Sequence, residues 1–599
     1  MSKNMARRVC FLFIPLLLTI SPQNSGAMAR KHLKSKGPVK ISFLLTNDIH
    51  GHLSPRLTYL GTLASQLRSR PEYASGEAGL LVLDSGDQFQ GTLLSNSDEG
   101  ESVFRVMNEV GYDAVVPGNH DYDFGPLGWL YDRVTPGITS SNPREVIERL
   151  SGIARFPLLS ANTYLKASLK SGGRPIALDD QCRPAQETPA QPISFEDGQA
   201  PSFLKPYAIF NRAGVRIAVI GIDNHGTSTS TTRENVSDLC FRDETEAYLD
   251  VRRKLEGKAD LFVLMMHNGN TDKVKEGSEI VRKINRAYPH GVHLAAAGHT
   301  HFVHNAEVDG VRVIQDGANG KFYGRVDLYY DPVNRQVKSE ETRSAAGILL
   351  DSSACDVEKA DFACAQLKLP LASLSSIDSI VSEAQTRAAP MAHRVLAKAD
   401  ASVKSHRINE SPLGNALADA LRAAGNTSVA LMNTGGIRAP LPAGEIKYED
   451  LFEVLPFQNQ AVILRELSWK KLKEVLLSAA KTCGRYGTLA QSGLRIRYER
   501  RCPEQGSDLD PHAKLIHVAM NDGTVLYDAE GTKEVSPEFT ISVITLDFLA
   551  SGGGGYSALA GVAIESQAGI ARELIANVWG EVIPSLRPEI DSRFLNVAK

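Results

Sequence analysis

The chain has 599 residues, 23% of them charged, and a formal net charge of −3 at pH 7. A chain of this length predicts more than one domain, each with enough apolar residues for its own core. The near-neutral charge provides no basic stripe for a phosphate backbone, which argues against a nucleic-acid polymer as partner.

The first 29 residues have the form of a secretory signal peptide. Arg7 and Arg8 precede the apolar residues 9–20, and polar residues then lead to Ala27-Met28-Ala29. The alternative, a transmembrane anchor, needs about 20 apolar residues, and this stretch is shorter. No later segment is apolar enough to span a bilayer, and the polar residues 585–599 argue against a lipid anchor. We therefore expect a periplasmic or secreted chain with no membrane anchor after signal removal.

The cysteines are consistent with export. The chain has seven, and removal of Cys10 with the signal leaves an even number, as is typical of disulfide-bonded proteins in oxidising compartments. The sequence does not fix their pairing, but closeness along the chain favours Cys355 with Cys364, Cys483 with Cys502 and, more weakly, Cys182 with Cys240. The alternative, a thiol nucleophile or a zinc ribbon, is disfavoured because no CxxC occurs.

Five apolar stretches in the first half of the chain are predicted to be strands, and each ends in metal-ligand residue types. Residues 41–45 lead to Asp48-Ile49-His50, residues 80–83 to Gly86-Asp87, residues 114–117 to Gly118-Asn119-His120, residues 261–266 to His267, and residues 294–297 to Gly298-His299-Thr300-His301. Ligands of α/β proteins gather at the carboxyl ends of strands, so we expect these side chains to meet at one rim. Imidazole and carboxylate bind zinc, manganese, cobalt or iron, and a shared carboxylate bridges two ions. The pattern predicts a centre for two divalent cations.

The alternative for residues 118–125 is a polar surface turn with no catalytic role. Short motifs recur by chance, and this octet alone would not decide the question. Five predicted strands that each end in metal-ligand residue types make a chance arrangement of these residues improbable.

In this order, the motifs DxHGH, GDxxxG, GNHxxDxG, HxG and GHTH resemble the signature of the calcineurin-like metallophosphoesterases. More narrowly, they are similar to the 5′-nucleotidase/UDP-sugar hydrolase branch, and the resemblance extends from about Val39 to Tyr556. It implies an α/β fold, with a two-sheet α/β/β/α sandwich over residues 39–345. A linker with a helix would follow over residues 346–391, and a smaller α+β substrate-binding domain over residues 392–599.

The resemblance also implies roles for individual residues and two divalent ions, whether zinc, manganese, cobalt or magnesium. One ion would be held by Asp48, His50, Asp87 and His301, and the other by Asp87, Asn119, His267 and His299. His120 would be the catalytic histidine, oriented by Asp123.

Residues 166–202 interrupt the first domain. They are rich in Pro, Gly, Gln and Asp and have no clean period, which predicts a long surface insertion closed by a disulfide. A role at the border of the cleft is the alternative, and a solvent loop without catalytic consequence is favoured over it.

The second domain follows a connector in which residues 367–381 show apolar residues at helical spacing before Pro390. Arg407 precedes a predicted helix that extends through Asp419, and a guanidinium fork suits phosphate or carboxylate. The alternative is that Arg407 caps a surface helix. Residues 429–432 are predicted to be a strand that leads into Asn433-Thr434-Gly435-Gly436-Ile437-Arg438, where amides and a cation favour an anionic ligand.

By resemblance, Arg407, Asn433, Gly436 and Arg438 would bind the nucleotide. Phe457 and Phe548 would stack on the two faces of the nucleobase, and each such stack contributes about 1–3 kcal/mol. Without the resemblance, a phenylalanine after a proline is more often a core residue.

The chain departs from the family at Ser551-Gly552-Gly553-Gly554-Gly555-Tyr556, where Gly554 stands at the position of an aspartate that binds the ribose hydroxyls. A site without that acceptor should discriminate less sharply for ribose. The hypothesis is that deoxynucleotides or other phosphate esters are accepted more readily.

The resemblance implies an exported hydrolase that releases phosphate from nucleoside 5′-monophosphates, with UDP-sugars or nucleoside di- and triphosphates as further substrates. The alternatives are a 2′,3′-cyclic nucleotide phosphodiesterase, a thiosulfate-ester hydrolase, and a non-catalytic nucleotide-binding protein. Phe457 and Phe548 favour the first function, and the pairing of His120 with Asp123 argues against the last. The sequence does not fix the native metals or the oligomeric state.

Overall fold

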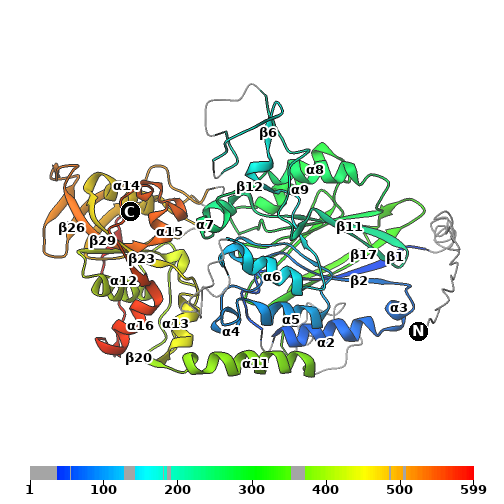
Figure 1. Cartoon of the computed structure of the whole chain (residues 1–599), viewed down its shortest axis with the longest axis horizontal. Coiled ribbons are helices and arrows are strands. Elements are labelled where there is room, and N and C mark those ends of the chain that lie inside the picture. The colour runs from blue at the N-terminus through cyan, green and yellow to red at the C-terminus, as the bar shows by residue number, and fades with distance from the viewer. Residues whose placement is uncertain are drawn as a thin grey trace, which may run out of the picture.

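The computed structural model describes residues 37–53, 56–126, 142–179, 181–184, 191–351, 372–484, 487–503, 507–583 and 585–598. The predicted signal peptide and the predicted Cys355–Cys364 pair lie outside these residues. Figure 1 shows a larger body formed by the N-terminal part of the chain and a smaller body formed by the C-terminal part. Within the described ranges, no helix has both the length and the apolar character needed to cross a bilayer.

The first sheet of the larger body has the strand order β18-β17-β1-β2-β3-β4-β9, with β19 beside β17. The strands are β1 (Val39–Thr46), β2 (Gly79–Asp84), β3 (Ala114–Val115), β4 (Leu158–Leu159), β9 (Leu204–Lys205), β17 (Phe322–Asp331), β18 (Gln336–Val337) and β19 (Arg343–Leu349). Neighbours from β1 to β9 pair in parallel, and β17 is antiparallel to β1.

The second sheet has the order β10-β11-β13-β14-β16-β15. Its strands are β10 (Tyr207–Arg212), β11 (Val215–Ile222), β13 (Leu261–Met266), β14 (Leu294–Ala296), β16 (Val311–Asp316) and β15 (Val303–Val308). β11, β13, β14 and β16 run parallel, so their carboxyl ends lie at one edge.

Alternation along the strands places one face of each sheet against the other sheet and the opposite face against helices. Phe43 and Leu45 of β1 join the core between the sheets, and Leu44 packs with the helices α2 (Arg56–Arg68) and α5 (Glu101–Val110). On β11, Val219 belongs to the core between the sheets, and Ile220 packs with α8 (Glu244–Lys254) and α9 (Glu276–Ala287). The predicted α/β/β/α sandwich is confirmed. Shorter helices of this body are α3 (Pro71–Ala74), α4 (Leu93–Asn96), α6 (Glu145–Ile153) and α7 (Arg233–Val236).

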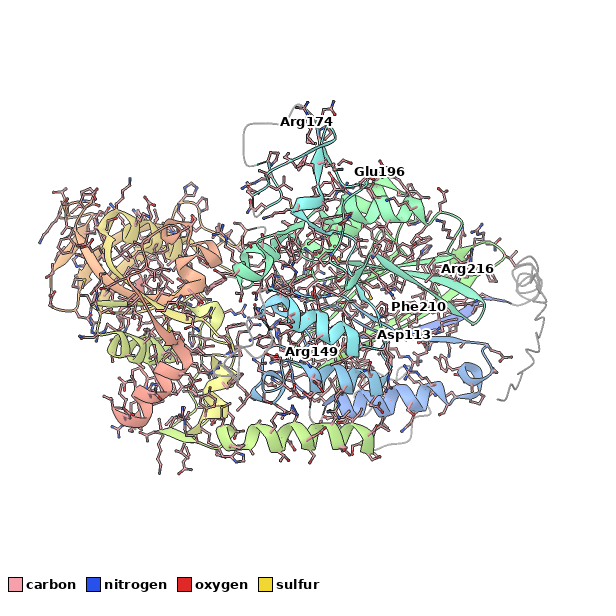
Figure 2. The ribbon with its side chains drawn as sticks, in the orientation of Figure 1. Asp113, Arg149, Arg174, Glu196, Phe210 and Arg216 are labelled. Carbon is pink, nitrogen blue, oxygen red and sulfur yellow. A yellow bond between two sulfur atoms is a disulfide. The ribbon has the colours of Figure 1, made fainter. Side chains whose placement is uncertain are left out.

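The predicted insertion forms a small sheet of its own, of β6 (Lys170–Ser171), β7 (Arg174–Pro175) and β8 (Ile193–Ser194). A disulfide joins Cys182 to Cys240 in β12 (Leu239–Phe241), which pairs with β5 (Thr163–Leu165). Figure 2 places Arg174 and Glu196 on this projection, at the periphery of the larger body. The insertion is therefore a disulfide-closed surface element with regular structure rather than an irregular loop.

Helix α11 (Ser375–Ala392) connects the two bodies along one side (Figure 1). Ile377 and Ile380 near its start lie in the core under the first sheet, and Ala388 and Ala392 near its end lie in the C-terminal core. The helix continues past Pro390 although proline removes one backbone hydrogen bond, because the flanking alanines are buried on both sides of it. Packing against both bodies fixes the direction of the connector.

The smaller body mixes helices with three sheets, as expected for an α+β domain. Their orders are β24-β21-β29-β23-β30, β28-β27-β26-β25-β32 and β22-β20-β31. The strands are β20 (Val395–Ala399), β21 (Val429–Asn433), β22 (Gly444–Lys447), β23 (Gln460–Ser468), β24 (Leu489–Ser492), β25 (Leu494–Glu499), β26 (Lys514–Met520), β27 (Val525–Asp528), β28 (Lys533–Glu534), β29 (Thr540–Leu546), β30 (Ser566–Ile570), β31 (Ser585–Leu586) and β32 (Phe594–Asn596). The helices are α12 (Pro412–Gly425), α13 (Tyr448–Val454), α14 (Trp469–Lys481), α15 (Asp547–Ala550) and α16 (Ala571–Glu581). The predicted disulfide between Cys483 and Cys502 is present.

Helix α12 illustrates why these residues form a helix at this position. The Ser411 hydroxyl accepts the Gly414 amide at 3.1 Å, and Pro412 occupies the first turn, where its missing N–H has no cost. The helix ends at Asn426, whose left-handed backbone (φ 45°) closes the last turn. These local signals place the start of the helix five residues after Arg407.

Asp316, the last residue of β16, connects the two sheets of the sandwich. Its carboxylate is buried and accepts the Gly347 amide of β19 at 3.0 Å, and its own amide donates to Asn47 Oδ1 at 2.7 Å. Burial raises the pKa of Asp316 to about 8. A group whose folded pKa exceeds its unfolded value stabilises the fold below the unfolded pKa, and that contribution is lost as pH rises through the folded pKa.

We therefore predict that the free energy of unfolding falls as pH rises from about 4 to about 8, because the native chain binds a proton at Asp316 that the unfolded chain releases. Asp316→Asn keeps a carbonyl oxygen for the Gly347 amide and cannot ionise. Urea denaturation over this pH range should show a smaller fall for the variant than for the wild-type chain. The control is Asp309→Asn on the exposed turn before β16. Equal slopes for all three proteins would contradict this account of Asp316.

Candidate metal centre

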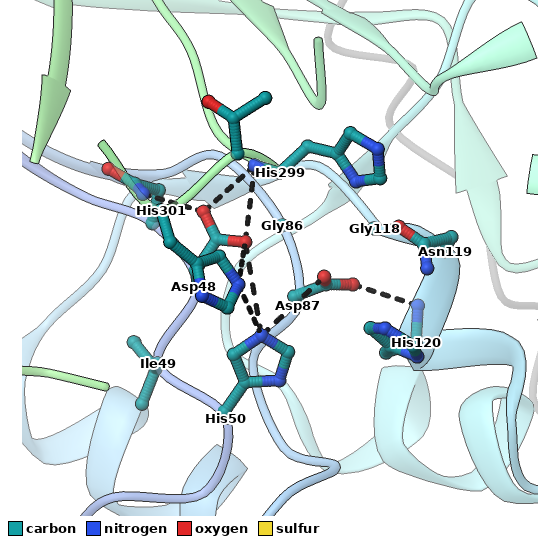
Figure 3. A network of polar contacts seen from close by, with 12 residues as sticks. Asp48, Ile49, His50, Gly86, Asp87, Gly118, Asn119, His120, His299 and His301 are labelled. Carbon is teal, nitrogen blue, oxygen red and sulfur yellow. Dashed lines mark hydrogen bonds and ion pairs between the residues drawn. The ribbon is translucent and has the colours of Figure 1, made fainter. Parts of the chain in front are cut away.

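Figure 3 shows that the loops carrying Asp48, Asp87, His120 and His299, which follow β1, β2, β3 and β14, converge at one edge of the sandwich. The loop after β13 joins them there, since His267 Nε2 lies 3.1 Å from Asp87 Oδ2. The predicted metal ligands lie together there. The rings of His267 and His299 are 5.0 Å apart, and those of His50 and His301 are also 5.0 Å apart. Side chains separated by up to about 250 positions of sequence therefore form one cluster.

Several site residues share an unusual backbone conformation. The left-handed non-glycine residues at the site are Asp48 (φ 51°), His50 (φ 50°), Asp87 (φ 59°), His299 (φ 74°) and His301 (φ 62°). Non-glycine residues seldom adopt this region, and such strain concentrates at functional sites. The loops are thus held in conformations that direct these side chains to one point.

Two glycines allow the loops to approach closely enough. A Cβ atom at Gly86 would overlap the His267 imidazole, and one at Gly118 would overlap the Asp87 carboxylate. Any larger residue at either position would push apart the loops that carry the candidate ligands.

The first group of candidate ligands consists of Asp48, His50 and His301, whose donor atoms lie within 4.8 Å of one another. His301 Nε2 is 3.3 Å from Asp48 Oδ1. His50 Nδ1 lies 2.9 Å from the Gln90 carbonyl, to which it can donate, and Nε2 then faces the group with a free electron pair. Burial, with a smaller effect from neighbouring cations, holds the pKa of His50 and of His301 well below the ordinary range. Both imidazoles are therefore in the neutral form that binds metals.

The second group consists of Asp87, His267 and His299, again within 4.8 Å. His267 Nδ1 is 2.7 Å from the Ser85 carbonyl, which fixes the tautomer and leaves Nε2 to face Asp87 Oδ2 at 3.1 Å. Nε2 makes no hydrogen bond of normal geometry, and neither does the buried Oδ1 of Asn119. Asn119 is oriented by its Nδ2, which donates to the Ser230 carbonyl at 2.8 Å.

The charges of the site favour bound cations. Asp48 and Asp87 are both buried, and Asp87 Oδ2 lies between the groups, 3.7 Å from His50 Nε2 and 3.1 Å from His267 Nε2. Burial alone would raise the pKa of Asp87, but the charges of His267 and other histidines hold it well below the ordinary range. Burial would lower the pKa of His267, but Asp87 and Asp48 raise it to about 10. The neutral imidazoles of His50 and His301 and the buried Asn119 Oδ1, which has no hydrogen-bond partner, are suited to metal ions. Together with the two buried carboxylates, they fit two divalent ions.

Asp121, for which the sequence pattern predicts no role, organises the loops. Its buried carboxylate accepts the amides of Gly118 at 2.7 Å, Asp87 at 2.9 Å and Gln88 at 2.9 Å. It therefore joins the loop after β2 to the loop after β3. The sequence shows that Asp121 lies within residues 118–125, but it does not show which amides donate to its two carboxylate oxygens.

His120 and Asp123 form the predicted pair, with His120 Nδ1 2.8 Å from Asp123 Oδ2. The Asp87 carboxylate accepts the His120 amide at 2.8 Å, so the pair is attached directly to the centre (Figure 3). The His120 ring stacks on Phe457 of the smaller body, with centroids 4.9 Å apart. The two bodies therefore meet at this histidine.

A cleft of about 450 Å³ lies between the bodies and includes Asp87, His120 and His301. All residues predicted to bind substrate line it, namely Arg407, Asn433, Gly436, Arg438, Phe457 and Phe548. None of the described residues of the insertion at 166–202 does so, as expected for a solvent element.

Arg438 extends from the smaller body to the metal groups, with Nη2 3.2 Å from His301 Nε2 and 3.4 Å from His50 Nε2. Arg407 lies nearby, and burial, together with the charge of Arg438, lowers its pKa to about 10. Two guanidinium groups that line the cleft next to two candidate cation sites give it a strong attraction for an anion.

A third cluster, His225, Glu244 and Glu276, lies outside the cleft. Glu244 Oε1 already accepts the His225 amide at 3.0 Å and Asn268 Nδ2 at 2.9 Å, and it lies 2.6 Å from His225 Nδ1. These contacts engage the carboxylate oxygen, and the cluster is interpreted as an ion pair at the start of α8.

Two family models match the chain. The model described as calcineurin-like phosphoesterase matches residues 41–303, which include both metal-ligand groups. The model described as 5′-nucleotidase, C-terminal domain matches residues 386–561, which include the cleft residues from Arg407 to Phe548.

The chain is also similar to several characterised proteins. Protein UshA of Escherichia coli (strain K12) is 25% identical over 582 residues, which make up 91% of each chain. A 5′-nucleotidase of Vibrio cholerae is 25% identical over 462 residues, or 70% of this chain and 72% of that protein. Endonuclease YhcR of Bacillus subtilis (strain 168) is 24% identical over 89% of this chain, but the chain spans only 39% of that longer protein.

Solved structures show the same fold. The 5′-nucleotidase precursor of Thermus thermophilus superposes with a TM-score of 0.67 at 21% identity, over 92% of this chain and 98% of that chain. The sulfate thiohydrolase SoxB of Thermus thermophilus gives a TM-score of 0.62 at 18% identity, over 92% and 95%. These likenesses concern the fold and do not distinguish between substrates.

We predict that the purified chain binds about two divalent ions, as the two groups around Asp87 require. His301→Ala and His299→Ala should each reduce the content to about one ion, because each removes a donor from one group. Manganese or zinc content after dialysis, measured by mass spectrometry, checks this expectation. His225→Ala is the control and should leave the content unchanged. Loss of metal in the control, or two retained ions in both site variants, would contradict the assignment.

Proposed function

The chain belongs to the 5′-nucleotidase family and is a calcineurin-like metallophosphoesterase, and on that basis we propose that it releases phosphate from nucleoside 5′-monophosphates. UDP-sugars and nucleoside di- and triphosphates are further candidate substrates. The observation that carries the proposal is the shared cleft, in which the metal groups around Asp87 lie beside Arg407, Arg438 and two phenylalanines.

We propose that the candidate ligands are divided between two ions. Asp48, His50, Asp87 and His301 would hold one ion, and Asp87, Asn119, His267 and His299 would hold the other. When bound, such ions polarise the phosphoryl oxygens and lower the pKa of the attacking water. The buried Asn119 Oδ1, which has no hydrogen-bond partner, supports this division, because a bound ion would satisfy it.

His120 is the proposed proton donor to the leaving group. Asp123 engages Nδ1, which leaves Nε2 available to the cleft. As water oxygen bonds to phosphorus and the bond from phosphorus to the 5′ oxygen breaks, a proton from Nε2 neutralises that oxygen. The attacking water releases a proton to solvent, and solvent returns one to Nε2 for the next turnover. Asp123 holds the ring in orientation through its contact with Nδ1.

Before cleavage, the smaller body would bind both the nucleoside and the phosphate of the substrate. Arg407 and Arg438 carry the charge that attracts the phosphate, and Asn433 and Gly436 lie on the same wall. Phe457 and Phe548 provide aromatic faces for a nucleobase, which accept any base without reading its edge.

We also propose that the chain is exported, with residues 1–29 as signal peptide and no membrane anchor in the mature form. The disulfides Cys182–Cys240 and Cys483–Cys502 support export, since such bonds persist in oxidising compartments. The domains are proposed to span residues 39–345 and 392–599, with residues 346–391 as linker.

We predict that phosphate release is highest with 5′-AMP and UMP and is abolished by a chelator, then restored by Mn²⁺ or Co²⁺. The panel includes UDP-glucose, ATP, 2′,3′-cyclic AMP, a thiosulfate ester and a DNA duplex, so that each alternative function has its own arm. Products are separated by chromatography, because cleavage of the cyclic nucleotide, UDP-glucose, the thiosulfate ester or DNA releases no inorganic phosphate. His120→Ala should lower kcat by about 100-fold or more while KM changes little, because the histidine acts on the leaving oxygen.

The control is His512→Ala, an exposed histidine outside the cleft. Hydrolysis of only the cyclic nucleotide would show that the enzyme is a phosphodiesterase, and hydrolysis of only the thiosulfate ester would show that it is a thiosulfate-ester hydrolase. Binding of nucleotide without turnover of any substrate would favour a binding protein, and undiminished turnover in His120→Ala would remove this residue from the mechanism.

Gly554 bears on the choice between ribose and deoxyribose. It lines the cleft in a left-handed conformation (φ 63°), and a Cβ atom there would lie 3.5 Å from Phe548 Cε1 and 3.6 Å from the Tyr556 ring. These are ordinary contact distances, and aspartate tolerates the left-handed region better than most residues. The position can therefore hold the carboxylate that the family motif places there.

We predict that wild-type enzyme hydrolyses AMP and dAMP with similar kcat/KM, and that Gly554→Asp raises the ratio of AMP to dAMP by about tenfold or more. A hydrogen bond from a sugar hydroxyl to a charged acceptor accounts for a change of that size. Gly561→Asp, on an exposed left-handed glycine outside the cleft, adds the same charge as a control. Strong rejection of dAMP by the wild-type enzyme would contradict the role given to Gly554.

A further inference from the structure

Asp123 has a second hydrogen-bonding partner besides His120. Its Oδ2 atom lies 2.8 Å from His120 Nδ1, and its Oδ1 atom accepts the Thr231 hydroxyl at 2.8 Å. Thr231 is 4% exposed and lies 108 positions further along the chain, between the short helix His225–Thr229 and α7. Both oxygens of the carboxylate are therefore engaged, one by the histidine and one by a hydroxyl from a distant segment.

The segment that carries Thr231 is attached to the His120 loop at several further points. The Ser230 carbonyl accepts Asn119 Nδ2 at 2.8 Å. Asn235 Nδ2 donates to the carbonyls of Tyr122 at 2.8 Å and Asp123 at 3.1 Å. Contacts on both sides of Thr231 fix its backbone, so the direction of its hydroxyl is determined by the fold.

We propose that Thr231 is a positioning residue for His120, acting through Asp123; this inference rests on the proposed function of His120. A carboxylate held through one oxygen can rotate about its terminal torsion, whose preferences are broad. The Thr231 hydroxyl removes that freedom, because rotation would break its bond to Oδ1. The fixed carboxylate then keeps the His120 ring turned with Nε2 toward the cleft, where the leaving oxygen must receive its proton.

The same geometry explains the identity of the residue. A hydroxyl has one proton, and donation to Asp123 uses it, so the side chain acts as a donor at this point. Serine retains the hydroxyl, whereas valine matches the shape of threonine without it. The pair Thr231→Ser and Thr231→Val therefore separates loss of the hydrogen bond from loss of packing.

The test compares steady-state kinetics of the wild-type, Thr231→Ser, Thr231→Val and His120→Ala proteins and the double variant Thr231→Val/His120→Ala. We expect Thr231→Val to lower kcat by about 10- to 100-fold, the usual effect of removing an outer partner of a site residue, with KM changed by less than about threefold. Thr231→Ser should recover most of the loss. In the His120→Ala background, Thr231→Val should have no further effect, since its action passes through the histidine.

The matched control is Thr229→Val, in the same segment, where the hydroxyl donates instead to the Gly226 carbonyl. Wild-type kcat in Thr231→Val, a rise in KM alone, or a loss that multiplies with that of His120→Ala would each overturn the proposal. A rise in KM alone would indicate that Thr231 contacts the substrate. Thermal unfolding of every variant shows whether a loss of activity reflects folding, and Thr231→Ala replaces Thr231→Val if the latter does not fold.

A spectroscopic measurement separates failure of this inference from failure of the proposed function. In protein labelled with ¹⁵N-histidine, the Nδ1–H proton of His120, identified by its absence in His120→Ala, should be protected from solvent exchange by Asp123. We expect Thr231→Val to broaden or remove this signal and Thr231→Ser to retain it, whichever substrate the enzyme turns over. An unchanged signal in Thr231→Val would refute the positioning role even if nucleotide hydrolysis is established.

Discussion

The burial of two carboxylates at adjacent strand ends is the constraint on which the site depends. Asp48 and Asp87 follow the parallel neighbours β1 and β2, and neither is exposed to solvent. Two anions removed from water destabilise the fold by several kcal/mol unless positive charge lies beside them. His267, Arg438 and the fit to two divalent ions all provide such charge, and the same positive charge makes the cleft suitable for a phosphate ester.

Rigid connections between loops give the centre its geometry. Asp121 joins the loops after β2 and β3 through three backbone amides, and the left-handed residues fix the direction of the ligands. The smaller body contributes the other wall of the cleft, with Phe457 against His120 and Arg438 against the ligand histidines. Catalytic and recognition groups thus reside on separate bodies, which α11 holds side by side (Figure 1).

The strands that support the centre were predictable because their signal is local. Each is a short apolar run buried on both faces, and a residue type that binds metal follows shortly after its end, as with Met266 followed directly by His267. Two of the expected disulfides were predictable from closeness along the chain. The small sheet within the insertion was not, because its strands have only two residues each and no periodicity. The continuation of α11 beyond Pro390 was also hidden, since tertiary burial of alanines outweighs the local preference of proline.

The sequence by itself determined the α/β class, the order of the motifs, and which side chains are chemically suited to cations, phosphate and aromatic stacking. Only the tertiary structure decided that Asp121 spans two loops and that Thr231 reaches the free oxygen of Asp123. Threonine and aspartate form hydrogen bonds in many contexts, and nothing in their neighbouring residues identifies a partner 108 positions away. The chemistry of each side chain can be read from the sequence at its own position. The pairing of distant polar groups depends instead on how the packed sheets and their loops bring them within about 3 Å of each other.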